Sequence, residues 1–139
     1  MKVKPQTIGS VLVILAVVVA GCGGNDFVSV TGTVTYDGKA LDTGMVTFSP
    51  AGGQGSIGYG SIQSNGSYEV KTGTSGGLPP GEYKVTVAAD GPMPPPTPEN
   101  PEPLPDSLIP TRYRSASTSG LTYTVTASGG TFDIKLTSN

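Results

Sequence analysis

The sequence predicts an all-β protein, built as an antiparallel Greek-key β-sandwich of about seven strands in two sheets. The chain of 139 residues contains 21 glycines and 13 prolines, whereas average usage is about 7% and about 5%. Both residue types destabilise helix interiors. Apolar and polar side chains alternate with a period of two along several segments, and glycine-containing turns separate these segments. Together these observations exclude a mostly helical protein.

The predicted strands follow one another from residue 27 onward. In the first, Val28, Val30 and Val34 alternate with polar residues, and threonines supply most of the polar face. The long alternating segments are 27–36, 82–89, 121–127 and 131–137, and the shorter runs are Val46–Ser49, Ser56–Gln63 and Tyr68–Lys71. Tyr68 and Tyr83 fall on apolar faces, so we expect their rings in the core and their hydroxyls hydrogen-bonded at its rim.

Turn signals lie between the predicted strands. Asp37-Gly38 and Asn65-Gly66 are strong hairpin signals, because Gly and Asn accept the positive φ that tight turns need. Gly129-Gly130 is expected to join the last two strands in the same way. The tripeptide Gly58-Tyr59-Gly60 lies within a strand-like run, which suggests a bulge or a sheet edge there.

A proline-rich segment, residues 91–110, interrupts this pattern. Nine of the 13 prolines lie between Pro92 and Pro110. Proline lacks the backbone donor that a sheet ladder needs, and runs of it favour polyproline II. We therefore expect a long loop between strands. Two interpretations of this loop stay open: a stiff, solvated connection, or a rigid projection that docks on an aromatic groove of a partner.

The first 21 residues have the organisation of a secretory signal peptide. Lys2 and Lys4 form a positive head, and the uncharged, mostly aliphatic run Ile8–Ala20 follows. This run has 13 residues, whereas a helix that spans a bilayer needs about 20. Residues 1–21 are therefore expected to be a leader that is removed.

The tetrapeptide Val19-Ala20-Gly21-Cys22 resembles the bacterial lipobox. This resemblance implies that a diacylglyceryl group is attached to the Cys22 thiol, that the leader is cut before Cys22, and that the new amino group is acylated. Such lipid chains hold a protein on a membrane. Residues 22–26 would then form a short tether, and residues 27–139 the folded domain. Cys22 is the only cysteine, so no intramolecular disulfide is expected.

The lipobox resemblance also implies a location. It predicts a protein of the bacterial cell envelope that is anchored to a membrane and faces the periplasm. Lipoproteins of this kind that stay in the inner membrane commonly carry Asp after the lipidated cysteine, and this chain carries Gly23. The outer membrane is therefore the favoured of the two membranes.

Composition excludes several kinds of chemistry. The chain has no His and one Cys, so a Ser-His-Asp or Cys-His arrangement is impossible and a zinc site lacks its usual ligands. The formal net charge of -2 offers no basic excess to a nucleic-acid backbone. We expect no catalytic residue, no metal, no cofactor and no nucleic-acid partner.

Four residues are candidates for a ligand contact: Tyr59, Tyr113, Arg112 and Arg114. The two tyrosines are the aromatic residues whose burial the alternation predicts least well, and the two arginines are the only ones in the chain. The arginines have two interpretations. They pair with Glu99, Glu102 or Asp106 and pin the proline-rich loop, or their planar donor groups contact an anion or carboxylate.

Four motifs follow one another along the predicted domain: Val30–Lys39 (VTGTVTYDGK), Gly44–Phe48, Asn65–Tyr68 and Leu78–Val85. Their order resembles the carboxypeptidase regulatory-like domain, and their combination with the lipobox resembles small lipoproteins of planctomycete bacteria. The resemblance implies a transthyretin-like (prealbumin-type) sandwich. It implies no peptidase activity, because in carboxypeptidases this domain is an accessory to a separate zinc domain.

The function expected from these features is that of a non-catalytic, lipid-anchored envelope protein that serves as an interaction or structural module. The expected partners are a membrane, reached through Cys22, and an envelope protein or glycan. The alternative is an envelope module that binds a glycan or a small anion through the four candidate residues.

Overall fold

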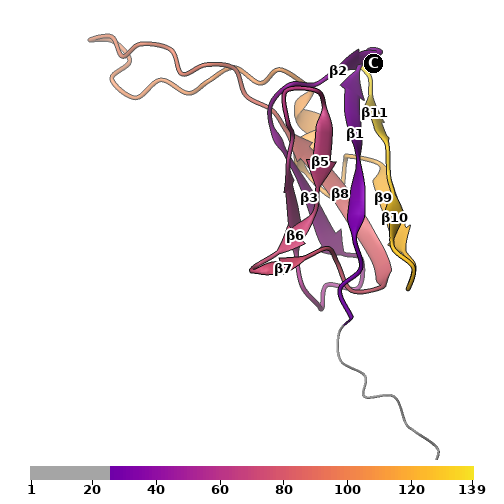
Figure 1. Cartoon of the computed structure of the whole chain (residues 1–139). Coiled ribbons are helices and arrows are strands. Elements are labelled where there is room, and N and C mark those ends of the chain that lie inside the picture. Colours follow the sequence, from indigo (N-terminus) through magenta and orange to yellow (C-terminus); the bar gives the residue numbers. More distant parts are fainter. Residues whose placement is uncertain (1–25) are drawn as a thin grey trace, which may run out of the picture.

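The computed structural model describes residues 26–139. The predicted leader, Cys22 and the tether up to residue 25 lie outside the described residues. Within them the strands form two sheets, and the only helix of that part of the chain is the short 3-10 turn η1 (Thr111–Arg114). Figure 1 shows the two sheets facing each other. The predicted all-β sandwich is confirmed.

The first sheet has β1 (Val30–Tyr36) at its centre. The other strands of this sheet are β2 (Lys39–Ala40), β5 (Ser67–Glu69), β10 (Gly130–Thr131) and β11 (Ile134–Leu136). β2 and β5 pair antiparallel with β1, whereas β10 and β11 pair parallel with it. Val30 and Val34 of β1 are buried between the sheets.

The second sheet has the strand order β7-β6-β4-β3-β8-β9, and every pairing in it is antiparallel. Its members along the chain are β3 (Met45–Pro50), β4 (Gly58–Ser61), β6 (Lys71–Thr72), β7 (Ser75–Gly76), β8 (Gly81–Ala88) and β9 (Leu121–Val125). β8 has the predicted alternation, because Tyr83, Val85 and Val87 are buried whereas Glu82 and Lys84 are exposed.

The core lies between the sheets and centres on Phe48 of β3, whose side chain is fully buried. Four rings surround it at centroid distances of 6.2 to 6.4 Å: Tyr68, Tyr83, Tyr123 and Phe132. The Tyr68 and Tyr83 hydroxyls donate hydrogen bonds to the backbone carbonyls of Phe132 and Pro79. The predicted core role of these two tyrosines is therefore confirmed.

The Asp37-Gly38 turn is confirmed as the hairpin that joins β1 and β2. Its two residues have φ angles of 48° and 81°, and two consecutive positive φ angles define the turn that best matches strand twist. The Asn65-Gly66 turn also forms, with a φ of 86° at Gly66. It carries the chain from β4 in one sheet to β5 in the other, so it closes no ladder between adjacent strands.

The expectation that Gly129-Gly130 forms a hairpin between the last two strands is wrong. β9 before it pairs with β8, whereas β10 and β11 after it pair with β1 in the opposite sheet. The segment therefore crosses between the sheets. A hairpin forces antiparallel pairing, but a crossing leaves the strand direction free, which explains why β10 and β11 run parallel to β1.

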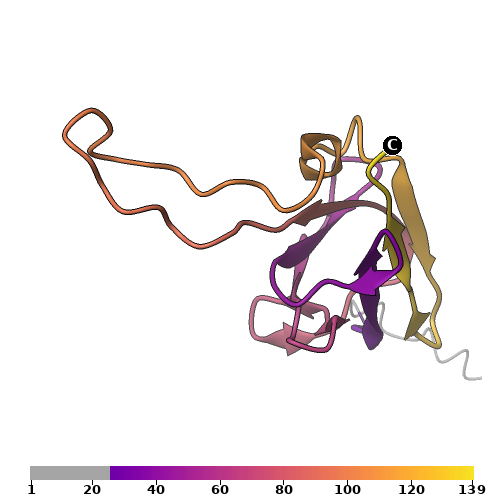
Figure 2. The same ribbon diagram turned by 90° about the horizontal axis from the view of Figure 1, so that it is seen from above.

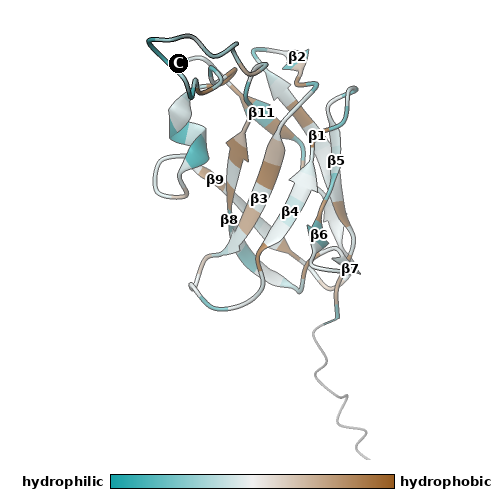
Figure 3. Cartoon of the chain, turned by 90° about the vertical axis from the view of Figure 1, so that its left-hand side faces the viewer, coloured by the Kyte–Doolittle hydropathy of each residue, from teal (hydrophilic) through white to brown (hydrophobic). Residues whose placement is uncertain are grey.

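The expectation of a bulge or an edge at Gly58-Tyr59-Gly60 is also wrong. β4 lies inside the second sheet, between β3 and β6, and keeps an unbroken register with β3. The glycines are there for packing: a Cβ at Gly58 would clash with Leu78 and Val70, and a Cβ at Gly60 would press on the Tyr68 ring. In Figure 3 this strand is accordingly paler than the apolar β3 beside it.

The proline-rich segment leaves the sandwich as a long projection, residues 91–106, which we call the proline arm (Figure 2). At its base the Gly91 N–H donates to the Asp106 carbonyl over 2.8 Å. At its tip Thr97 and Asn100 exchange two backbone hydrogen bonds of 3.0 Å. No residue between base and tip belongs to a strand. The expectation of a long loop outside the sheet ladders is confirmed.

The arm and the start of β1 lie at opposite ends of the sandwich (Figure 1). At one end, which we call the leading end, Val28 bridges Leu78 just before β1 begins. At the other, which we call the arm end, lie the arm base, η1 and the C-terminus. β1 alone, with 7 residues, separates the two ends by about 23 Å, because a strand rises about 3.3 Å per residue.

Candidate functional site

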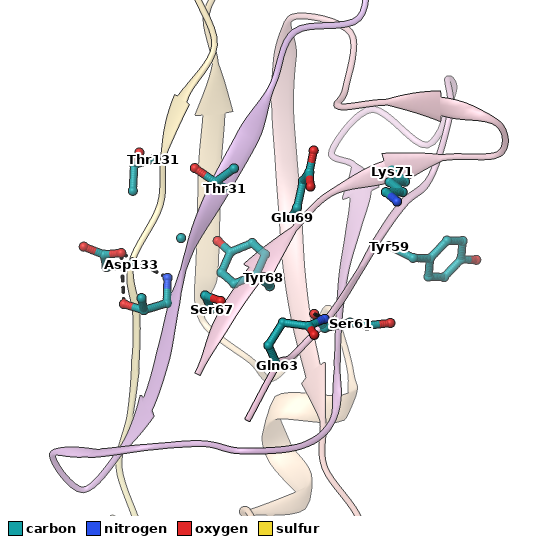
Figure 4. Close-up of a pocket in the computed structure, with 12 residues that line it drawn as sticks. Thr31, Tyr59, Ser61, Gln63, Ser67, Tyr68, Glu69, Lys71, Thr131 and Asp133 are labelled. Atoms are coloured by element: carbon teal, nitrogen blue, oxygen red, sulfur yellow. Dashed lines mark hydrogen bonds between the residues drawn. The ribbon is translucent and has the colours of Figure 1, made fainter. Parts of the chain in front are cut away.

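A concave surface lies at one corner of the sandwich, where β4 of the second sheet meets β5 of the first (Figure 4). This corner cleft has a volume of about 700 Å³, within the range of about 300–1,000 Å³ found for small-molecule sites. Most of the residues that line it have polar side chains. The lining side chains that could contact a ligand include Thr31, Tyr59, Gln63, Glu69, Lys71 and Asp133.

The chain builds this corner by passing from one sheet to the other at Val70. Tyr68 and Val70 point into the core and are 2% and 0% exposed, so the residues that alternate with them, Glu69 and Lys71, are exposed on the cleft side. Neither charged side chain takes part in an ion pair or side-chain hydrogen bond with another residue of the described segment 26–139. Both are therefore available to a ligand.

Tyr59 presents a flat aromatic surface at the rim of the cleft. Its side chain is 48% exposed, and Figure 4 shows the ring directed away from the sheet. In the register of the second sheet Tyr59 pairs with Thr47 on β3 and with Lys71 on β6. Adjacent strands lie about 4.8 Å apart, so the Lys71 side chain starts immediately beside the ring.

The inner wall of the cleft is rigid. Asp133 accepts hydrogen bonds from the backbone N–H and the hydroxyl of Thr33, both over 3.1 Å. The Phe132 carbonyl accepts the Tyr68 hydroxyl and approaches Gly32 so closely that a Cβ there would overlap it. Burial, with a further contribution from the negative Asp133, raises the pKa of the Tyr68 phenol well above its ordinary value. Tyr68 therefore remains a neutral donor.

Tyr113 and Arg112, two of the four candidate ligand residues, lie in η1 and make internal contacts. Tyr113 is only 5% exposed, and its hydroxyl accepts hydrogen bonds from Arg112 Nη2 at 2.9 Å and from the Thr137 N–H at 3.0 Å. Burial alone would raise the pKa of the Tyr113 phenol, but the hydrogen bonds with Thr137 and Arg112 outweigh it and lower the pKa overall. These contacts fasten the segment after β11 to η1.

Arg114, the third candidate, forms a salt bridge with Asp90 at the arm base. The expected pairing of the arginines with Glu99, Glu102 or Asp106 is wrong within the described residues, because Asp90 is the sole acidic partner there. The reason is geometric. Glu99 lies in the tip, between the paired Thr97 and Asn100, and Glu102 follows soon after it, whereas Asp90 pairs with Ser107 at the base beside η1.

The structure does not bring the four candidates together. Tyr59 lies at the corner cleft, whereas the other three contribute to the packing of the arm end. Sequence reasoning missed Gln63, Glu69 and Lys71 as cleft residues. The sequence analysis predicted a short strand at Tyr68–Lys71 with Tyr68 in the core. The crossing at Val70, which turns Glu69 and Lys71 towards Tyr59, has no recognisable pattern in the sequence. Cys22 lies outside the described residues.

The described residues offer neither a cluster of metal ligands nor a membrane-spanning helix. Across residues 26–139, no three acidic side chains lie close enough together to hold a metal ion. In the same stretch, no helix has the length and apolar character that a membrane crossing demands. The corner cleft combines two acids, one base, an amide and several hydroxyls with an aromatic surface. That arrangement suits hydrogen bonding of a polar ligand.

Comparison with known proteins found no matching family model, no matching curated protein and no matching solved structure.

Proposed function

We propose that this protein is a lipid-anchored β-sandwich of the bacterial cell envelope, held to a membrane at Cys22 and acting without catalysis as an interaction or structural module. In this proposal it faces the periplasm, with the outer membrane favoured. We also propose that it belongs with the carboxypeptidase regulatory-like lipoproteins of planctomycete bacteria. The ordered sequence motifs support this, and a two-sheet sandwich is the architecture that such a relationship requires.

The opposite placement of the anchor side and the arm carries the proposal. The tether from Cys22 to Asp26 reaches about 13 Å when extended, and the first described residues, which precede β1, lie at the leading end. A lipid-anchored chain would therefore hold its leading end near the membrane and direct its arm end away from it. The arm then projects towards whatever lies above the membrane surface.

The arm itself is suited to contact with a partner protein. Leu104 is 83% exposed and Met93 is 67% exposed, on a segment that also carries Glu99 and Glu102. Polyproline II is stiff and its backbone is unpaired, so binding orders few new groups and costs little conformational entropy. The matching partner surface is an apolar or aromatic groove with a basic rim.

Cell fractionation tests the anchor. In a bacterial host that processes lipoproteins, the full chain should be found in the membrane fraction and Cys22→Ser should release it into the soluble fraction. Ser117→Ala, at an exposed site near η1, serves as the control and should remain with membranes. A wild-type chain found in the soluble fraction would refute the anchor.

Site-specific crosslinking tests the role of the arm. A photo-crosslinking residue at position 104 should give a discrete adduct in intact envelopes, and the same residue at position 39, in the β1–β2 hairpin, should not. Moving the crosslinking residue from position 104 to position 39 in the anchored chain should therefore abolish the adduct. Equal adducts at both positions, or none at position 104, would contradict an interaction role for the arm.

For the alternative function, binding of a glycan or small anion, the structure changes which of the candidate residues are available to a ligand. Arg112, Tyr113 and Arg114 have their principal polar contacts inside the protein, which favours a structural role for all three. Tyr59 differs from them, because its ring is exposed and borders the corner cleft.

A further inference from the structure

We infer that the corner cleft binds a neutral glycan, with one sugar ring stacked on Tyr59 and its hydroxyls hydrogen-bonded by Gln63, Glu69 and Lys71. This is a binding activity additional to the anchored interaction module, and it does not depend on lipid attachment or on the arm. Three features of the cleft support this inference: its exposed aromatic surface, its charge, and the hydrogen bonds that order its wall.

Tyr59 supplies the stacking surface. Sugar rings have one face of C–H groups, and aromatic rings with exposed faces pack against such surfaces while the hydroxyls stay wet. The flanking Gly58 and Gly60 draw β4 close to the core, because a Cβ at either position would meet core side chains. Nearly half of the Tyr59 side chain nevertheless remains exposed, on a regular strand inside the sheet. Its position is therefore fixed without its face being covered.

The charges of the cleft favour a neutral ligand over an anionic one. Glu69 and Lys71 are two positions apart on the same exposed side of the corner, so their opposite charges largely cancel at a distance. Asp133 on the wall near β1 adds a further negative charge to the cleft, which disfavours an anion. A carboxylate accepts hydrogen bonds and an ammonium donates them. Sugar hydroxyls both donate and accept, so a single sugar residue can satisfy both groups, whereas an anion would be repelled by Glu69.

The remaining polar groups give the cleft a fixed edge. Gln63 Nε2 donates to the Ser61 carbonyl over 3.3 Å, which leaves its amide oxygen free to accept a hydrogen bond. Asp133 is held by Thr33, as described above. Figure 4 shows Gln63, Glu69 and Lys71 arranged between Tyr59 and β1. A wall that is already ordered lowers the entropy lost on binding.

Saturation-transfer NMR with the full chain in zwitterionic, sugar-free detergent tests this inference. The probes are neutral cello-, xylo-, malto- and chito-oligosaccharides, with an oligogalacturonate as the acidic comparison. We expect saturation of the ring C–H protons of at least one neutral probe, strongest on one face of the sugar.

The variants separate a specific site from general adhesion. Tyr59→Ala should weaken binding at least about tenfold, whereas Tyr59→Phe should retain most of it. Glu69→Gln and Lys71→Met should each weaken it less. Phe27→Ala removes an exposed aromatic residue that lies outside the cleft lining and should change nothing. The variants change exposed side chains, so their folding can be verified by circular dichroism.

Three outcomes would overturn the inference. They are the absence of saturation for every neutral probe, equal binding by Tyr59→Ala and the wild type, and saturation of the acidic probe alone. None of these outcomes touches the anchor or the arm, which are tested by fractionation and crosslinking.

Discussion

In the sandwich body, Phe48 touches four aromatic rings and side chains such as Val85 and Val87 are completely buried. In the proline arm, no residue from 92 to 105 is buried, and hydrogen bonds close only the base and the tip. The body is thus ordered by removing apolar surface from water, whereas the arm is ordered by the restricted backbone of proline. Stability and projection are provided by separate parts of one chain.

The largest effect is expected from Phe48→Ala, which removes the ring at the centre of the body. Loss of a fully buried phenylalanine destabilises a protein by about 3–5 kcal/mol, because it combines lost transfer free energy with a cavity. Urea unfolding of the full chain measures the change, and Phe48→Leu should lose less. A loss below about 1 kcal/mol would mean that the body does not depend on this cluster.

Tyr68→Phe is expected to cost about 1–3 kcal/mol, because it leaves the Phe132 carbonyl without its donor. It should also change the response to alkaline pH. Burial raises the pKa of Tyr68 in the folded protein above its value in the unfolded chain. The contribution of Tyr68 to the free energy of unfolding is therefore complete below about pH 10 and is lost as the pH rises further. Urea unfolding across this range should show a shallower decline for Tyr68→Phe than for the wild type. Tyr59→Phe should match the wild type at neutral pH.

A smaller effect is expected from Arg114→Met, which removes the salt bridge at the arm base. Both side chains are partly exposed, at 36% and 41%, and such pairs contribute up to about 1 kcal/mol. Hydrogen exchange should quicken at Gly91 and Leu108, whose backbone bonds close the base, and should stay unchanged in β3 and β8. Faster exchange throughout β8 would instead connect the arm to the stability of the body.

The smallest effect is expected when residues 92–105 are replaced by Asn-Gly between Gly91 and Asp106. The deleted residues bury no side chain, and the flanking residues already pair across the base. Loop-closure entropy changes by about 0.6 kcal/mol for each doubling of length, so the shortened chain should be equally or slightly more stable. A marked loss of stability in urea unfolding would show that the arm belongs to the folding unit.

Local patterns predicted the body well. The alternation of Tyr83, Val85 and Val87 with charged residues is sufficient to predict β8, and Asp37-Gly38 is sufficient to predict its hairpin, because both depend on neighbours in sequence. The role of Gly58 and Gly60 could not be predicted in the same way. It depends on Leu78, Val70 and Tyr68, which reach β4 only after both sheets have formed.

The candidate site was harder to predict than the fold. The exposure of Tyr59 could be suspected from its glycine neighbours, but its association with Gln63 and Glu69 requires the chain to change sheets twice, at the Asn65-Gly66 turn and at Val70. One of the two interpretations of the arginines pairs them with acidic residues nearby in sequence, in the proline-rich loop. Their actual partners, Asp90 and Thr137, are brought near only by the return of the arm and by the position of β11.

The pairing of β1 with β11 has a consequence for the order in which the domain can fold. The earliest strand of the first sheet is hydrogen-bonded to the latest, with Val34 opposite Ile134 and Tyr36 opposite Leu136. Contacts of such long sequence separation form slowly, and this one needs residues at both ends of the domain at once. A chain that becomes available from its N-terminus, as during synthesis, therefore cannot complete the first sheet until residue 136 is free to pair with β1.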